Sequence, residues 1–386
     1  MMKKTIALVS LGLGLTFSIP SLPAMAQLRQ ITVNPQSNAL GMDEQIWGSP
    51  DSPGDKEALL RSIDHSLRYL STPGAARSYQ RYPVRGVTLS RVQRSLRRFR
   101  ELVVTSQSPA ELQAAIEREF VFYKSVGRSS DGKVYFTAYY EPIYAASRTP
   151  SAEYRYPLYR KPSNFSSWRK PHPSRAELEG RDGTGRGGRL AGNELVWLRD
   201  RFEAFLVHIQ GSARLELPDG SVMTVGYGGN TDYPYNSVGR EMIKDGLHPS
   251  DGFTLPKMIE IFQQRPELLD VYLPRNNRFI FFQETNGAPA TGSLNVPVTA
   301  DRSIATDKSQ MPPGALALVR TQIPYFNQEG ELEYRLVSRY VLDQDTGSAI
   351  KSPGRVDLFL GTGPEAGARA GVVGGLGDLY YPLLRN

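Results

Sequence analysis

Two aspartates near the C-terminal end of the chain are the residues whose placement best suits chemistry. Asp357 lies in the run RVDLFLGTG (355–363), whose apolar residues alternate as in a strand, so that Asp357 shares the opposite face with Arg355 and Phe359. Asp345 begins a Thr-Gly turn twelve residues earlier, and a strand–loop–strand could bring both carboxylates to one rim. Asp357 is either a structural carboxylate bonded to nearby amides or an acid kept partly dry for catalysis, and the residues alone favour the structural role.

The sequence lacks the residue patterns that other common kinds of catalysis need. The four histidines are far apart in sequence and form no helical His-x-x-x-His pair, namely His65, His172, His208 and His248. There is no Gly-x-Ser-x-Gly elbow and no cysteine to act as a nucleophile. The glycines of GRDGTGRGGRLAGN (180–193) follow no strand and precede no Gly-Lys-Ser/Thr, so we expect a loop rather than a phosphate site. The sequence therefore predicts no metal and no cofactor, and leaves carboxylate chemistry.

The first 26 residues predict export. Lys3 and Lys4 precede an apolar stretch that is short for a bilayer span, and Ala24-Met25-Ala26 is typical of a signal peptidase site. Without a cysteine the chain has neither a disulfide nor a lipid attachment site, so we expect a soluble periplasmic or wall-associated protein, monomeric by default, with no transmembrane segment after cleavage. Removing two lysines and no acid lowers the net charge from +7 to +5. That charge suits a polyanion, and after export a cell-wall polymer suits it better than a nucleic acid.

The order of elements predicts helices first and strands afterwards. Residues 27–54 lack periodicity and are rich in polar residues and proline, which indicates a flexible tether. Apolar spacing predicts amphipathic helices over 55–70 and 88–104, and the capping box SPAE opens a third at Ser108. The arginines of the second helix indicate a solvated face, or alternatively a contact surface for anionic wall peptides. From Lys133 short β-like runs dominate, with a helical interlude over 238–272, and the length predicts two domains.

Six motifs in order give the chain a family resemblance. They cover about residues 135–371 and are FTAYYEP (136–142), YPLYRKP (156–162) with SRAEL (174–178), IQGSA (209–213), VGYGGNTDYPYNSVGR (225–240), DRSIATD (301–307) with PPG (312–314), and the segment from Asp345 to Gly371. Together they resemble the lytic murein transglycosylase A family, whose members cleave peptidoglycan. Ala138, Ala213 and Ser348 stand where glycine is usual in that family.

The resemblance implies a mainly β fold of the α+β class. It consists of a double-psi β-barrel domain (55–135 plus 276–386, with the N-terminal helices), a β-rich substrate-binding domain inserted over 136–275, and a groove between them. It also implies that Asp357 is the catalytic acid and that Asp345 is its Asp-x-Gly partner. The residues matched to motif positions that line the saccharide groove are Thr137, Tyr139, Tyr140, Gln210, Gly211, Ser212, Tyr227 and Asn230. Tyr139 and Tyr140 are adjacent in a strand and face opposite ways, so we expect only one to reach the sugar.

The implied reaction needs one carboxyl group. Asp357 would protonate the oxygen between N-acetylmuramic acid and N-acetylglucosamine, and its conjugate base would then take the proton of the muramoyl 6-hydroxyl as a 1,6-anhydro ring closes. An aspartate at its ordinary pKa of about 3.9 is ionised at neutral pH, so burial or a nearby charge must raise the pKa of Asp357. Two alternatives stay open. One is a hydrolase on the same scaffold in which Asp345 or Glu141 activates water, although Glu141 is better explained as a salt-bridge partner; the other is a non-catalytic wall-binding protein.

Overall fold

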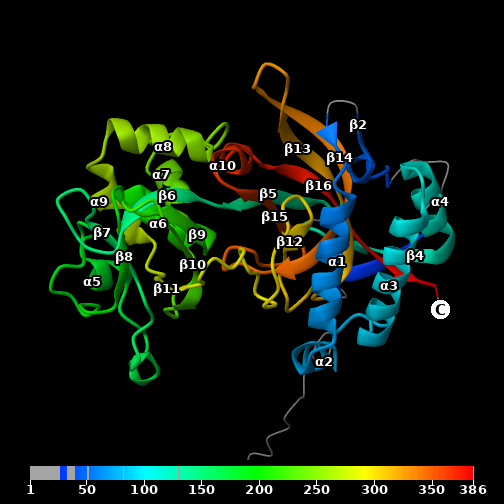
Figure 1. The fold of residues 1–386 in the computed structure, drawn as a ribbon, viewed down its shortest axis with the longest axis horizontal. Coiled ribbons are helices and arrows are strands. Elements are labelled where there is room, and N and C mark those ends of the chain that lie inside the picture. The colour runs from blue at the N-terminus through cyan, green and yellow to red at the C-terminus, as the bar shows by residue number, and fades with distance from the viewer. Residues whose placement is uncertain (1–26, 33–39, 50–51, 81, 129–130, 386) are drawn as a thin grey trace, which may run out of the picture.

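The computed structural model describes residues 27–32, 40–49, 52–80, 82–128 and 131–385 (Figure 1). The predicted signal peptide, residues 1–26, lies outside these ranges. Within them, no helix combines the length and the apolar character needed to cross a bilayer.

Six strands close a barrel at the centre of the molecule (Figure 1). Around the ring they run β16 (Gly375–Leu384), β13 (Leu316–Phe326), β14 (Leu332–Asp345), β12 (Ser303–Ala305), β15 (Arg355–Thr362) and β5 (Val134–Glu141), which pairs again with β16. The pairs β12–β14 and β15–β5 are parallel and the others antiparallel. β4 (Phe120–Ser125) and β1 (Leu28–Ile31) continue the sheet from β16. The predicted barrel with a second β-rich domain is therefore confirmed.

Four helices cover one side of the barrel (Figure 1), namely α1 (Lys56–Leu70), α2 (Pro73–Gln80), α3 (Leu89–Thr105) and α4 (Pro109–Glu119). The hydroxyls of Thr88 and Ser108 accept the backbone N–H of the third helical residue of α3 and α4, which explains where these helices begin. The three predicted helices are confirmed, and their apolar stripes join the barrel in one core. The arginines of α3 are largely engaged within the protein: Arg91 is buried, Arg98 pairs with Glu119, and Arg100 pairs with Asp64.

The prediction of a flexible tether over 27–54 is wrong for the described residues. β1 pairs with β4, and Leu40 and Ile46 are buried in the barrel core. Asp43, also buried, bonds the guanidinium of Arg302. These residues lack periodicity because their partners lie far away in sequence. The remaining short elements of this region are η2 (Glu44–Ile46), β2 (Gly48–Ser49) and β3 (Ser52–Pro53).

The second domain is built on a six-stranded sheet, drawn in green in Figure 1. Its order is β11 (Ile280–Glu284), β10 (Val222–Asn230), β9 (Ala213–Glu216), β6 (Ile143–Ser147), β8 (Glu194–Leu198) and β7 (Tyr156–Tyr159). Its helices are η3 (Phe165–Ser167), α5 (Arg175–Glu179), α6 (Arg201–Gln210), α7 (Val238–Lys244), α8 (Leu255–Gln264), α9 (Leu268–Tyr272) and η4 (Leu273–Arg275).

The strand pairing in the structure gives this domain other limits than those predicted from the sequence. β5 pairs with β15 and β16, so residues 136–141 belong to the barrel rather than to the inserted sheet. β11 pairs with β10 along five residues, so the inserted sheet extends past residue 275 to Glu284. The predicted return to the barrel domain at residue 276 is therefore too early, because a strand's pattern does not show which sheet it joins.

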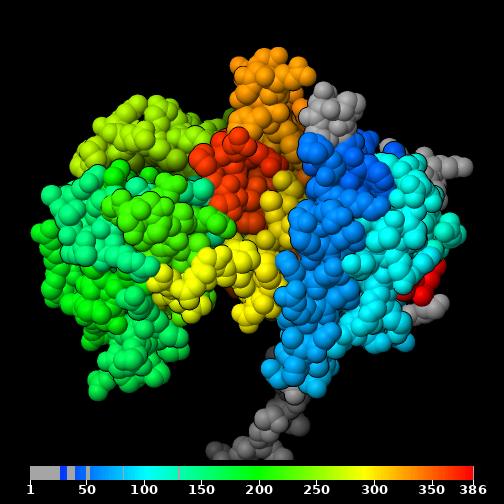
Figure 2. Space-filling view, viewed as in Figure 1, coloured from blue at the N-terminus to red at the C-terminus, as the bar shows by residue number. Residues whose placement is uncertain are grey.

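Helix α10 (Pro364–Ala370) lies between the two units. Figure 2 shows it in red, between the inserted domain in green and the β13–β14 hairpin in orange. The backbone N–H of Leu255, at the start of α8, donates to the carbonyl of Gly371 just after α10. Tyr140 of β5 packs so closely against Gly367 that a side chain there would collide with its ring. The hydrogen bond from Leu255 therefore joins the inserted domain to the barrel at α10, and the Tyr140 contact holds α10 against β5.

Candidate active site

Four residues at one level of the barrel form a row across four strands. Ala305 of β12 is in register with Asp345 of β14 on one side and Asp357 of β15 on the other. Asp357 is in turn in register with Thr137 of β5. In-register side chains point to the same face of a sheet, so the two carboxylates face the same way across the small Ala305. Their strands are two spacings apart, about 9–10 Å.

Asp357 is a half-buried acid with one engaged oxygen. The Thr137 hydroxyl donates to Oδ1 at 2.6 Å, and within the described residues Oδ2 has no hydrogen-bond partner. Burial raises the pKa of Asp357 to about 6, against the lowering effects of the Thr137 hydrogen bond and the Arg355 charge; the charge of Asp345 also raises it. An acid of this strength keeps a substantial protonated fraction near neutral pH.

Arg355 is a site residue that the sequence did not identify. Its guanidinium donates to the Thr137 hydroxyl oxygen at 2.9 Å while stacking over the Tyr135 ring, 5.2 Å from its centroid. Because this oxygen accepts from Arg355, the hydroxyl proton of Thr137 is free to go to Oδ1 of Asp357. The acid proton of Asp357 is then favoured on Oδ2. The signal was available, since Arg355 precedes Asp357 by two residues and shares its strand face.

Asp345 is held by hydrogen bonds from three donors. The backbone N–H groups of Ser293 and Thr346 each donate to Oδ1 at 2.8 Å, and the Tyr139 hydroxyl donates to Oδ2 at 2.9 Å. Both oxygens are therefore occupied. The structure places Asp345 beside Asp357 as a fixed negative charge and an anchor for Tyr139.

The side chains of the two adjacent tyrosines of β5 point to opposite faces of the strand, as expected. Tyr139 lies on the face of the two aspartates, with its ring 5.2 Å from that of Phe359. Tyr140 is buried on the other face, where its hydroxyl lies 3.3 Å from that of Tyr144. The prediction that Tyr140 lines a saccharide groove is therefore wrong for its side chain, which fills the core instead.

The predicted residues of the inserted domain form two groups. Gln210 ends α6 and its side-chain oxygen accepts from the backbone N–H of Tyr140 at 3.1 Å, followed by Gly211 with φ of 86° and by the partly exposed Ser212. Tyr227, exposed by 53%, donates its hydroxyl to the side-chain oxygen of Asn230 beside a β-bulge of β10.

Neither group makes a direct hydrogen bond to Asp357 among the described residues. In this domain burial raises the pKa of Tyr235, and the charges of Arg355 and Asp357 also act on that pKa, which places Tyr235 within electrostatic range of the acid.

Glu141 is a structural carboxylate. It is 1% exposed, and its Oε2 accepts from the Arg214 guanidinium and from the Thr362 hydroxyl, each at 2.9 Å. The salt-bridge assignment is thus confirmed. Among the described residues no group of three or more His, Asp or Glu side chains is arranged to hold a metal ion.

Two family profiles match the chain along the units seen in the structure. A profile described as "MltA specific insert domain" matches residues 135–283, and one described as "3D domain" matches residues 302–382, which include Asp345 and Asp357. Together they span more than half of the sequence. The chain therefore resembles lytic murein transglycosylase A proteins in both of its units.

Relatives from several bacteria support this resemblance. Membrane-bound lytic murein transglycosylase A of Escherichia coli K12 is 31% identical over 248 residues, which are 64% of this chain and 64% of the relative; that of Vibrio cholerae is 28% identical over 264 residues, 67% and 68% of the two chains. The chain thus matches somewhat less than two thirds of the length of the Escherichia coli relative.

Solved structures share the fold of this chain. The membrane-bound lytic murein transglycosylase of Agrobacterium tumefaciens is 27% identical, with a TM-score of 0.66, and the match covers 84% of this chain and 92% of that one. The Escherichia coli MltA structure with bound chitohexaose has a TM-score of 0.71 at 22% identity, with 95% and 96% covered.

Proposed function

We propose that the protein is a peptidoglycan lytic transglycosylase. The matching family profiles and the names of the relatives in Escherichia coli and Vibrio cholerae support this class. The observation that carries the proposal is the state of Asp357, which is half-buried, has a pKa of about 6 and keeps one oxygen free. The bound chitohexaose of the Escherichia coli structure supports a β-linked glycan as the ligand class. The predicted signal peptide supports action in the cell envelope, and we take a monomer as the default state.

In the proposed reaction, Asp357 acts twice. Its Oδ2 gives a proton to the glycosidic oxygen between N-acetylmuramic acid and N-acetylglucosamine as the bond to C1 breaks. The muramoyl 6-hydroxyl oxygen then bonds to C1, and its proton returns to the Asp357 carboxylate, so no water is consumed. General acid assistance of this kind contributes about 10²–10⁴ in rate, or roughly 3–5.5 kcal/mol. The attacking group is already part of the substrate, and proximity replaces an activated water.

The occupied state of the other carboxylates supports a transglycosylase over a hydrolase. A hydrolase needs a second carboxylate to activate water or to form a covalent intermediate. Both carboxylate oxygens of Asp345 accept hydrogen bonds, from the Tyr139 hydroxyl and from two backbone N–H groups. Glu141 is buried in an ion pair with Arg214. Neither is available as a base. We assign Thr137, Arg355 and Tyr139 to positioning around the acid, and Gln210, Gly211, Ser212, Tyr227 and Asn230 to contacts with the glycan.

The test is the mass of the released muropeptides. Digestion of peptidoglycan by the purified protein should release fragments ending in 1,6-anhydromuramic acid, and fragments heavier by one water would contradict the proposal. Asp357→Asn should abolish release while binding to peptidoglycan persists. A D357N variant that still releases fragments would refute the role of this acid, and a wild type that binds without releasing any would favour a wall-binding protein.

A further inference from the structure

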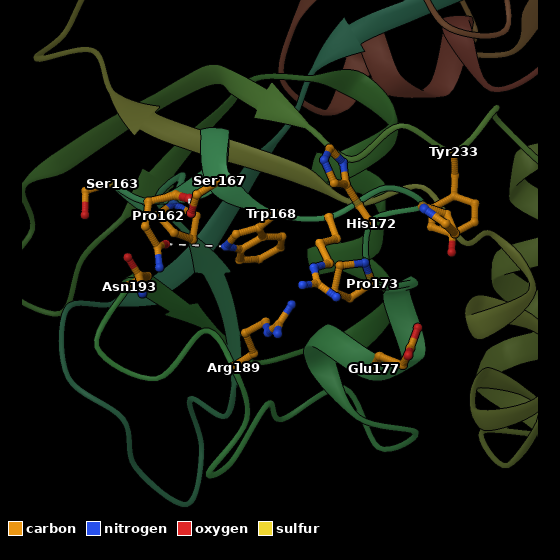
Figure 3. Close-up of a pocket in the computed structure, with 13 residues that line it drawn as sticks. Pro162, Ser163, Ser167, Trp168, His172, Pro173, Glu177, Arg189, Asn193 and Tyr233 are labelled. Atoms are coloured by element: carbon orange, nitrogen blue, oxygen red, sulfur yellow. Dashed lines mark hydrogen bonds between the residues drawn. The ribbon is translucent and has the colours of Figure 1, made fainter.

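The inserted domain contains a cavity whose lining residues all lie outside the barrel. It has a volume of about 830 Å³, and Figure 3 shows its lining side chains. Its walls come from the loop 162–173, from α5, from the glycine-rich loop 180–193 and from Tyr233. The glycine-rich loop, for which the sequence suggested no role, therefore forms part of a concave surface.

Arg189 of that loop presents a positive charge to the cavity, and this charge also helps to lower the pKa of the Glu177 carboxyl group. Its guanidinium lies over the Trp168 ring, 5.1 Å from the centroid, and Figure 3 shows it directed at that ring. Within the described residues Arg189 makes no hydrogen bond and no ion pair. The acidic lining residue, Glu177, is occupied as the capping box of α5, where it accepts from the backbone and hydroxyl of Ser174 at 2.7 and 2.6 Å.

The other polar groups of the cavity are mostly donors or can serve as donors. Nδ1 of the buried His172 lies 3.1 Å from the backbone nitrogen of Asp232 and 3.2 Å from the Asp232 carboxylate, and Nε2 makes no hydrogen bond among the described residues. The Tyr233 hydroxyl and the Asn193 amide make no side-chain hydrogen bonds among the described residues, and Arg169 adds an exposed second positive charge. A guanidinium stacked on an indole, with amide and hydroxyl groups nearby, is suited to a carboxylate.

We propose that this cavity binds the carboxylate-bearing peptide stem of peptidoglycan, an inference that rests on the proposed function. The stem hangs from the muramoyl residue, so the cavity must lie within its reach of the acid. Tyr233, at the cavity wall, precedes Tyr235 by two residues, and Tyr235 lies within electrostatic range of Asp357. Two residues span at most about 7 Å and a four-residue stem about 13 Å, so a stem is long enough to cover the step between Tyr235 and the cavity wall.

A stacked sugar fits the cavity less well than a carboxylate does. Arg189 covers one face of Trp168, and the rings of Phe165 and His172 lie 5.0 and 6.3 Å from it, so little of the indole face is left for a pyranose. A saccharide at this position is an outcome that the experiment below detects.

The experiment compares glycan strands that carry stems with strands whose stems have been removed by an amidase. For Arg189→Gln we expect KM on stemmed strands to rise about tenfold or more, as for the loss of a charge-assisted hydrogen bond, with kcat and the activity on bare strands unchanged. Arg189→Lys should recover part of the loss. The matched control is Arg186→Gln, an exposed arginine of the same loop that does not line the cavity and should leave both substrates unaffected.

Binding of free stem tetrapeptide to the D357N protein, measured by calorimetry, separates this inference from the proposed function. Binding that is weakened by R189Q, and equally by amidation of the peptide carboxylates, supports the cavity even if no anhydro product forms. Equal loss on stemmed and bare strands would identify a sugar site and overturn the proposal. Unchanged KM on stemmed strands, or tetrapeptide binding that is indifferent to R189Q, would overturn it as well.

Discussion

The acid strength of Asp357 results from neighbours with opposing effects. Burial raises its pKa, and the nearby charge of Asp345 adds to this, while the Thr137 hydroxyl and the Arg355 charge lower it. The outcome, about 6, lies between a free aspartic acid and a group that would stay protonated at all physiological pH values. Activity should therefore respond to pH in the range where bacterial envelopes work.

We predict a pH profile with a single descending limb. If Asp357 is the acid and no second carboxylate is the base, kcat/KM should be level below pH 6 and fall about tenfold per pH unit above it, because the protonated fraction of the free enzyme falls in that way. Initial rates of anhydromuropeptide release from pH 4 to 9 measure this. A bell-shaped profile with an ascending limb near pH 4–5 would indicate a second carboxylate acting as base.

Arg355→Gln should move that limb to higher pH. The substitution removes a cation that lowers the pKa of Asp357 and leaves Thr137 without its donor, so the acid should hold its proton longer. We also expect kcat to fall about tenfold, since the proton is no longer favoured on Oδ2. Arg128→Gln is the control: Arg128 lies over the same Tyr135 ring at 5.4 Å but has no hydrogen bond to Thr137. An unmoved limb in R355Q would contradict the positioning role.

Asp357→Asn should also stabilise the fold at neutral pH. The folded-state pKa of about 6 lies above the unfolded value of about 3.8, so keeping the carboxylate ionised above pH 6 costs folding free energy, up to about 3 kcal/mol. That cost is absent below the unfolded pKa. The free energy of unfolding of D357N should thus exceed that of the wild type at pH 7.5 and match it below pH 4, as urea titrations would show. Asp345→Asn removes only the smaller contribution that the Asp345 charge makes to the raised pKa of Asp357 and disturbs three hydrogen bonds, so any gain should be smaller.

Among the elements, β5 does most to unite the site with the rest of the protein. One face carries Thr137, Tyr139 and Glu141 at alternate positions, which bond Asp357, Asp345 and Arg214 respectively. Its other face buries Phe136 and Tyr140 in the core. The strand therefore orients both aspartates and, through Glu141, connects them to β9 of the inserted sheet.

Breaking the Glu141–Arg214 pair should cost stability. Arg214→Met leaves a buried carboxylate with only the Thr362 hydroxyl as a partner, and the loss should be about 3 kcal/mol. Thermal unfolding measures it, and the double variant E141Q/R214M should recover part of the loss because no charge is then buried. If R214M and the wild type unfold at the same temperature, the Glu141–Arg214 pair does not hold the two units together.

At the scale of single elements, the sequence could predict the features that appear as a local pattern of residues. Alternation predicted β15 and placed Asp357 and Arg355 on one face, and the caps at Thr88 and Ser108 mark where two helices begin. The three residues of β12 are too few to show a pattern, yet Ala305 aligns the two aspartates. The core position of Tyr140 and the sheet of β11 depend on barrel closure and long-range pairing, which motif order alone does not encode.

At the scale of the whole molecule, ion pairs attach the segment before α1 to the barrel. Arg302, fully buried next to β12, donates to Asp55 just before α1 and to Asp43, which is 259 residues away in sequence. Asp43 also accepts from the backbone N–H of Tyr340 at 2.8 Å. The inserted domain is held on the other side by Glu141–Arg214, by Gln210 and by Leu255. The site row thus lies between two sets of long-range contacts.

Asp43→Ala should therefore weaken the site as well as the fold. It leaves part of a buried guanidinium and a buried backbone N–H without acceptors, at a cost of about 3 kcal/mol or more. Because Arg302 adjoins β12, the protection of β12 and β15 amides in hydrogen exchange should fall with the melting temperature, and activity should fall with it. The matched control is Asp64→Asn, which breaks a half-exposed pair with Arg100 and should cost less than about 1 kcal/mol. If D43A and D64N unfold at the same temperature, the segment is a tether after all, because its buried carboxylate would then contribute no more than a surface one.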